Sequence, residues 1–496
     1  MSENIKYNLQ ENIDYLKNEF ENCSDIVFKK INIGNFNSYI VYTDGMIDEY
    51  LLTEGVLKKL STLKSNLNEV SIDSLIPIGQ ITKLNSLDEC IEKILSGGVV
   101  LFIKGKKSSL NIMLPKYPAR SIEKPEVEPT INGPKESFTE TLSTNIALIR
   151  KRLLHKECKF KEINIGNYLK SKISLAYIDS LTNKHILNEV IRRLNTIKEN
   201  NLLDVSYIEE LIEDNPNSIY PTMQITERPD KVVASLLEGK VAILQENSPY
   251  AIIVPCFFSD LFQSPDEYYF RYFFASFLRI LRYFGYVVTC FLPAFYIAIT
   301  NFNQEMLPTK LLISIQNQRS GVPFPTVLEA FLMEIAFEIM REAGARLPKA
   351  IGPAISIVGG LVIGDAAVRA GLASPAIVIV IAFTAINSFL IPSILLNAPK
   401  LYLRIISIIL SGILGLWGIF IVILLNLAHM ASLTSFGVPY LAPISPNINE
   451  TLNNITYRPP IWNLKENRLN IFSKKYDSII RNNNNNNCQK NISRRD

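Results

Sequence analysis

The sequence contains little histidine and cysteine. Its three histidines, His155, His185 and His429, are far apart, and its six cysteines show no CxxC spacing. Zinc sites need several clustered histidine or cysteine ligands, and a Ser-His-Asp triad needs a histidine beside its serine. No glycine-rich phosphate-binding sequence follows a predicted strand. We therefore predict that the protein is not an enzyme and has no catalytic residue, metal site or cofactor.

A strong charge of one sign and an N-terminal signal peptide are also missing. The 51 basic residues nearly balance the 47 acidic ones, and the net charge of +4 is too small to predict a nucleic-acid partner. The N-terminus contains no apolar segment of the kind that directs secretion. We therefore expect residues 1–280 to stay on the cytoplasmic side of the membrane, with the cysteines as reduced thiols.

Long apolar runs are missing from the first half of the chain and are concentrated in residues 284–427. A helix that spans a bilayer requires about 20 predominantly apolar residues, so the spans are expected there. The predicted fold class is a soluble α/β N-terminal region of two repeated subdomains, followed by an all-α polytopic transmembrane domain and a short polar C-terminal tail.

An internal repeat divides the soluble region. FKKINIGN at 28–35 returns as FKEINIGN at 160–167, and ILSGGVVLF at 94–102 is echoed by LLEGKVAIL at 236–244. Alternating β-branched residues and helical periodicity predict the order strand, helix, helix and hairpin in each copy. The expected boundaries are residues 1–118 for the first subdomain, 119–140 for a proline-rich linker and 141–256 for the second subdomain.

Residues 257–283 are aromatic and basic, and we expect them to form a helix that approaches the cytoplasmic face of the membrane. Arg271, Arg279 and Arg282 would then lie near the lipid headgroups, in agreement with the positive-inside rule. The alternative is an ordinary amphipathic helix that packs in a protein core.

Four apolar segments of a transmembrane domain at 284–427 are expected to span the bilayer. They are residues 284–302, 351–372, 376–396 and 405–427. Residues 326–342 are short and charged, so they are expected to be an interfacial, re-entrant or fifth spanning element. The tail covers residues 428–496 and is predicted to be disordered from about residue 482, where asparagine dominates.

Three glutamates define an acidic helix within this domain. Glu334, Glu338 and Glu342 recur every four residues and therefore share one helix face. Two interpretations stay open: a solvated face of an interfacial helix, or a ring of carboxylates that attracts cations when several copies surround a pore. Glu342 can also pair with Arg346, four residues later.

The segment 351–372 carries two contrasting stripes. Small residues that let helix backbones approach closely in lipid form the first: Gly352, Ser356, Gly360, Gly364, Ala367 and Gly371. The second consists of Val358, Val362, Asp365 and Arg369. Its two charged residues either form a salt bridge at the interface or lie at the mouth of a pore that the two valines close as a hydrophobic gate. Because one copy has too few helices to enclose a wide pore, the pore interpretation requires a homo-oligomer, whose contact the small residues can form.

Six long runs of the sequence together match one known family. They are GPKESFTETLSTNIALIRKRL at 133–153, RPDKVVASLLEGKVAIL at 228–244, QSPDEYY at 263–269, PFPTVLEAFLMEIAFEIMREAGARLPKAIG at 323–352, SIVGGLVIGDAAVRAGLASPA at 356–376 and PYLAPISP at 439–446. On these runs the chain resembles the A subunits of bacterial spore germinant receptors, the GerA family. The departures lie in the N-terminal 20 residues and the asparagine-rich tail.

The resemblance implies a multi-pass subunit in the inner membrane of the dormant spore, beside a transporter-like B subunit and a lipoprotein C subunit. Such a complex responds to small nutrients, and ion release begins germination. The resemblance also adds Glu329 to the acidic helix. The family motifs fall on Pro323, Pro325, Glu329, Glu334, Glu338, Arg341, Glu342, Arg346, Gly360, Gly364 and Asp365.

The resulting hypothesis is a nutrient-responsive assembly in the lipid bilayer that forms or gates an oligomeric ion channel. Two alternatives stay open. One is a scaffold that anchors partner subunits without conducting ions. The other is a secondary transporter, which the small number of spans and the lack of a symmetric pair of broken helices make weaker.

Overall fold

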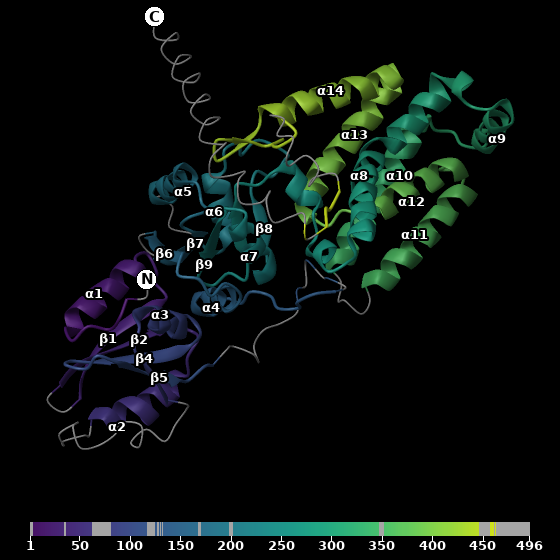
Figure 1. Cartoon of the computed structure of the whole chain (residues 1–496). Coiled ribbons are helices and arrows are strands. Elements are labelled where there is room, and N and C mark those ends of the chain that lie inside the picture. Colours follow the sequence, from purple (N-terminus) through teal and green to yellow (C-terminus); the bar gives the residue numbers. More distant parts are fainter. Residues whose placement is uncertain are drawn as a thin grey trace, which may run out of the picture.

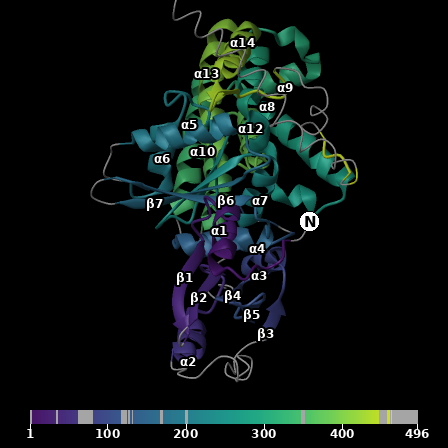
Figure 2. The same ribbon diagram turned by 60° about the vertical axis from the view of Figure 1, so that its left-hand side comes forward.

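The computed structural model describes residues 3–33, 36–61, 81–116, 125, 128, 130, 132–166, 170–197, 202–346, 352–445, 457–460 and 462. The molecule is elongated, with three parts in a row. Figures 1 and 2 show one β-sheet at one end, a second sheet in the middle and a group of helices at the other end.

The first sheet is antiparallel and is covered by helices on both faces. Its strands lie in the order β1 (Ile26–Ile33), β2 (Phe36–Thr43), β4 (Gly98–Ile103), β5 (Ser109–Met113) and β3 (Ile81–Leu84). One face packs against α1 (Leu9–Glu19) and α3 (Leu87–Leu95), and the other against the π-helical turn η1 (Leu51–Leu57) and α2 (Lys58–Ser61). The central strand β4 is apolar throughout because both of its faces are buried: Val100 points to the first core and Val99 to the second.

The second sheet has the same strand order. Its strands are β6 (Cys158–Ile165), β7 (Ser171–Ile178), β9 (Val241–Gln245), β10 (Ala251–Val254) and β8 (Gln224–Thr226). The helices α4 (Leu142–Arg152) and α7 (Pro229–Leu237) cover one face. The helices α5 (Lys184–Thr196) and α6 (Val205–Ile212) cover the other.

The matching strand orders agree with the repeat read from the sequence, and the α/β N-terminal region followed by a helical part is confirmed. The predicted order within each copy was incomplete, however. The strands that carry the repeated FKxINI sequence, β1 and β6, pair with the following strands β2 and β7 as hairpins, and the edge strands β3 and β8 were missed. Strands of three or four residues are too short to show a period-two pattern.

The C-terminal part is a bundle of helices. It comprises α8 (Tyr272–Asn301), α9 (Thr309–Arg319), α10 (Thr326–Arg346), α11 (Gly352–Arg369), α12 (Pro375–Ser388), α13 (Asn397–Leu414) and α14 (Leu416–Ser432). The long helix α8 packs against α12, α13 and α14, while α10 lies between α8, α11, α12 and α13. The acidic helix is therefore an inner member of the bundle, with neighbours on several sides.

The segment expected as one helix at 257–283 is divided. It begins with two 3-10 turns, η3 (Phe258–Phe262) and η4 (Pro265–Tyr268), and only then enters α8. Pro265 begins the second turn, and Ser264 and Glu267 close it as a capping box. As a result α8 also contains the segment predicted as the first span, 284–302, apart from its last residue.

The third and fourth predicted spans are also interrupted. The segment 376–396 contains α12 except for its first residue and, after a stretch around Pro392, the 3-10 turn η6 (Ile394–Leu396). The segment 405–427 is split between α13 and α14 at Gly415, whose φ of 62° is left-handed. A Cβ there would lie 2.9 Å from Phe302. Among the described residues, two helices are long and apolar enough to cross a membrane, Tyr272–Asn301 and Ile394–Leu414.

The start of the predicted tail belongs to the second subdomain. The hairpin of β11 (Thr434–Ser435) and β12 (Val438–Pro439) places Phe436, Val438 and Ala442 in the core between the second sheet and α5–α6. The chain thus leaves the bundle and returns to the second α/β subdomain. The disorder predicted from about residue 482 falls outside the described residues.

Candidate functional site

The carboxylate of Glu329 connects α10 to the beginning of α12. It is fully buried and accepts hydrogen bonds from the backbone N–H and the hydroxyl of Ser374, the N-cap residue of α12. Arg319 of α9 lies 4.0 Å from its second oxygen. A negative charge at a helix N-terminus meets unpaired N–H groups and the positive end of the helix dipole, so Glu329 holds these three helices together.

Glu334 forms a buried ion pair in the centre of the bundle. It pairs with Arg404 of α13, and the side chains of both residues are only 2% exposed. Arg404 also lies 3.9 Å from Glu338, which in turn pairs with Arg341 of its own helix. Charges in an apolar interior are costly unless they are paired, so these pairs fix the distance between α10 and α13.

A second cation of α13 meets the other end of α12. The ammonium of Lys400 is buried and donates to the carbonyl of Ser388, the last residue of α12, at 3.1 Å. A cation at a helix C-terminus satisfies a carbonyl that has no partner within the helix. Both ends of α12 are therefore held by charged side chains of neighbouring helices.

The face expected for the acidic helix is only partly present. Glu334 and Glu338 point to α13, whereas Glu342 is 63% exposed and pairs with Arg346. The sequence identified the glutamates but gave no signal for Arg404, which lies on another helix far along the chain.

The two stripes of α11 lie on different sides of the helix. Gly364 faces α12, since a Cβ there would lie 3.3 Å from Val378, and Ala367 is buried in the same cluster. The opposite side is open: Val362 is 56% exposed, and Asp365 and Arg369 form an exposed ion pair of 2.8 Å. Gly364 and Ala367 thus pack within the chain, whereas Val362, Asp365 and Arg369 are not covered by the described residues of this copy.

The remaining positions of the small stripe differ from one another. Gly360 has open space where a Cβ would point, and Gly371 follows the helix with a φ of 68°, next to the carbonyl of Gly321. The side-chain surroundings of Gly352, Ser356 and Val358 lie outside the part that the structure describes.

The arginines expected near the headgroups have different surroundings. Arg279 and Arg282 both pair with Glu267 of η4, which is fully buried, and Arg282 also donates to the carbonyl of Phe262. Arg271 is exposed and is the N-cap residue of α8. The run QSPDEYY contained Glu267, but its role as an anchor of α8 could not be read from spacing.

Further polar contacts attach the bundle to the second subdomain. Tyr220 donates to Asn426 of α14 at 2.8 Å and shares a hydrogen bond of 3.1 Å with Tyr286 of α8. Ser218 lies 3.0 Å from the His429 ring. These residues precede β8 and were not predicted, because nothing in their local sequence marks them.

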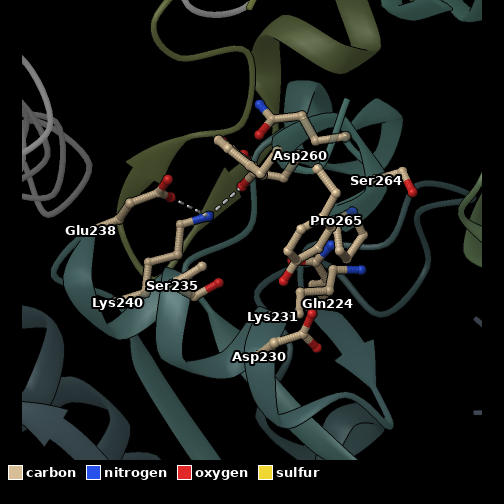
Figure 3. A pocket seen from close by; sticks show the side chains of 13 residues that line it. Gln224, Asp230, Lys231, Ser235, Glu238, Lys240, Asp260, Ser264 and Pro265 are labelled. Carbon is tan, nitrogen blue, oxygen red and sulfur yellow. Dashed lines mark hydrogen bonds and ion pairs between the residues drawn. The ribbon is translucent and has the colours of Figure 1, made fainter. Parts of the chain in front are cut away.

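Lys240 makes another attachment next to a cavity (Figure 3). Its ammonium is buried and forms an ion pair of 2.6 Å with Asp260 of η3 and a longer one of 3.9 Å with Glu238. Burial disfavours the charged form, but the two carboxylates outweigh it and raise the pKa of Lys240 above its usual value. The described residues contain no cluster of three or more side chains suited to a metal ion.

Comparison with known proteins identifies close relatives. Residues 14–470 match the family model for the Bacillus/Clostridium GerA spore germination protein. The chain is 38% identical over 465 residues to spore germination protein KA of Bacillus subtilis (strain 168), covering 92% of this chain and 86% of that protein. It is 37% identical over 473 residues to spore germination protein A1 of the same organism, covering 95% of each.

One solved structure is also similar. It is the N-terminal domain of the A subunit of the Bacillus megaterium spore germinant receptor GerK3, with a TM-score of 0.42 and 26% sequence identity. The match covers 52% of this chain and 98% of that one.

Proposed function

Because the chain belongs to the GerA family of spore germination proteins, we propose that it is the A subunit of a nutrient-responsive germinant receptor. In this proposal it lies in the spore inner membrane as a multi-pass homo-oligomer, with the soluble region on the cytoplasmic side. A transporter-like B subunit and a lipoprotein C subunit complete the receptor. The oligomer forms or gates an ion channel whose opening triggers germination.

The uncovered stripe of α11 is the observation that carries this proposal. Asp365 and Arg369 are exposed in one copy, at 56% and 79% of the side chain. A charged side chain that faces lipid is costly, by about 3 kcal/mol or more at the bilayer centre and less toward the surface, so such a face favours water or another protein chain. A ring of identical copies supplies both, because it turns the same face of every copy toward a common axis.

The chemistry of the stripe suits a gate. Val362 lies one turn before Asp365, and Val358 lies one turn before Val362. A ring of valine side chains excludes water from a narrow pore, and ions cannot cross a dry constriction. The charged residues at the end of the helix would then face the aqueous mouth. The buried pairs of α10 and α13 would hold the helices behind the gate in place.

Ion flux from reconstituted receptors tests the proposal. The chain and its B and C subunits are inserted in lipid vesicles, and efflux is recorded for wild type, Val362→Ala and Ile379→Ala. Ile379 is the matched control, since it is an exposed apolar residue of the neighbouring helix α12. Constitutive efflux in Val362→Ala alone is expected, because alanine widens and wets the constriction.

The alternatives predict other results. No efflux from wild type or Val362→Ala, with both shown to be folded and oligomeric, would favour the scaffold function. Efflux that requires a co-transported nutrient, and that saturates with it, would favour a secondary transporter.

A further inference from the structure

A cavity lies between the second subdomain and the turns that lead into α8. Its volume is about 180 Å³. One wall is formed by β8 and α7, and the other by η3, η4 and the residues that follow them (Figure 3). Two of the runs that carry the family resemblance, 228–244 and 263–269, supply most of the lining, and the function proposed above assigns no role to either.

Two lining side chains are polar and buried, and neither has a hydrogen-bond partner within the part of the chain that the structure describes. Gln224 of β8 is 4% exposed and Ser235 of α7 is 7% exposed. Figure 3 shows both among the side chains around the cavity. Their polar atoms lie at the cavity wall and are not engaged by side chains or backbone of the described residues. They are therefore available to donate to and accept from a ligand inside the cavity.

The charged side chains of the wall, by contrast, already have partners. Asp230 pairs with Arg228 at 2.8 Å, Lys231 pairs with Glu128 at 2.6 Å, and Lys240 pairs with Asp260 at 2.6 Å. An ion that entered the cavity would have to compete with these short pairs for its counter-charge. The lining thus favours an uncharged ligand over an anion or a cation.

The neutral part of the lining indicates the class of ligand. A carboxamide and a hydroxyl offer both donors and acceptors, and Tyr268 and Tyr269 add aromatic rings. A small polyhydroxyl compound matches this set, since its hydroxyl groups both donate and accept while its C–H faces can lie on a ring.

We propose that the cavity between α7 and η3–η4 binds a small uncharged polyol or sugar through Gln224 and Ser235. The site adds a ligand to the soluble region and does not depend on ion conduction by the helices. Because the cavity adjoins η4, ligand binding is expected to affect the start of α8. Because Glu267 of η4 anchors Arg279 and Arg282, a ligand that holds η4 against α7 also fixes the first turns of α8.

Saturation-transfer NMR on the purified full chain in detergent tests the site, with glycerol, sorbitol and glucose as probes. Phosphate and free lysine are the charged comparators. Competition experiments or calorimetry then give the Kd of any compound that binds. At least one polyol should bind saturably to wild type. Gln224→Met combined with Ser235→Ala should raise the Kd about tenfold or more, the effect expected from losing two neutral hydrogen bonds.

The matched control combines Gln245→Met and Ser248→Ala. Both residues are buried in the same subdomain, but their side chains bond to Leu202 and Asp204 and do not line the cavity. The control should keep the wild-type Kd within twofold even if its melting temperature falls. The proposal is overturned if folded wild type binds none of the three polyols, if only the charged comparators bind, or if both double variants behave alike.

Discussion

The junction between the two sheets and the interior of the bundle each contain a buried arginine–carboxylate pair, but their surroundings differ. Arg150 of α4 donates to both oxygens of Asp25 and to the carbonyls of His155 and Cys158. Arg404 forms ion pairs only with carboxylates of α10 among the described residues, with Glu334 near and Glu338 at 3.9 Å. Hydrogen bonds to the surrounding backbone therefore fix the Arg150–Asp25 pair. The geometry of the Arg404–Glu334 pair depends on the relative position of α10 and α13.

This difference suggests which of the two regions can change its arrangement. Removing Arg150 would also take away the guanidinium that donates to two backbone carbonyls. In the bundle, a small shift of α10 along α13 would exchange one glutamate for the next as the partner of Arg404, because the two glutamates lie one turn apart. The junction between the sheets is therefore expected to be the stiffer of the two.

The largest effect is expected from Arg404→Leu. The substitution leaves Glu334 charged and unpaired in an apolar interior, and the free energy of unfolding should fall by about 3–5 kcal/mol. Thermal unfolding in detergent would measure this loss. Adding Glu334→Gln should restore part of the stability, since it removes the isolated charge. A single variant as stable as wild type would show that the pair does not hold α10 to α13.

A smaller loss is expected from Arg150→Leu. Asp25 also lines a cavity of about 280 Å³ between the subdomains, so water can solvate its carboxylate once the arginine is gone. We expect a loss of roughly 2–3 kcal/mol in the same assay. Asp25→Asn in the Arg150→Leu background should recover part of it. An effect larger than that of Arg404→Leu would reverse the ranking of the two pairs.

Gly415→Ala tests the break that positions α13 and its arginine. The left-handed φ and the close approach of Phe302 should together cost about 1–2 kcal/mol. Gly105→Ala is the matched control, because its φ of 84° is similarly left-handed while a Cβ there would meet open space. The difference in melting temperature between the two variants isolates the contact with Phe302. Equal effects would mean that the backbone conformation alone matters.

The smallest effect is expected at Glu209, a carboxylate of α6 without an ion pair among the described residues. Burial, together with repulsion from Glu213, raises the pKa of Glu209 to about 7. A carboxyl whose pKa is raised in the folded state stabilises the protein only while it is protonated. The protein therefore loses this stability as the pH rises from the pKa of the unfolded state toward 7. Glu209→Gln should therefore increase stability at pH 8 by roughly 1 kcal/mol and leave it nearly unchanged at pH 4. A pH-independent change in melting temperature would contradict this.

Local patterns in the sequence predicted part of the fold. The repeated motif predicted two related subdomains, and the alternation of apolar residues predicted strands, because it reflects burial of one face of a sheet. Apolar runs located the bundle but not its breaks: residues 405–427 are apolar on both sides of Gly415, so hydropathy does not reveal the turn there or the close approach of Phe302.

Of the candidate site, the contacts within one helix were predicted and those between helices were not. Local spacing identified the i, i+4 pairs of Glu342 with Arg346 and of Asp365 with Arg369. The partners of Glu329, Glu334 and Arg279 come from distant segments, which no spacing rule connects.

Cross-linking between copies tests the oligomeric pore most directly. Val362→Cys and Ile379→Cys are introduced separately into a chain with Cys488→Ser; the five described native cysteines are buried. Copies whose α11 helices surround one axis bring the sulfurs of Cys at 362 within disulfide distance. Oxidation of membranes should therefore give covalent dimers for Val362→Cys and monomers for Ile379→Cys. Monomers for Val362→Cys, with dimers for Ile379→Cys, would contradict a pore along α11.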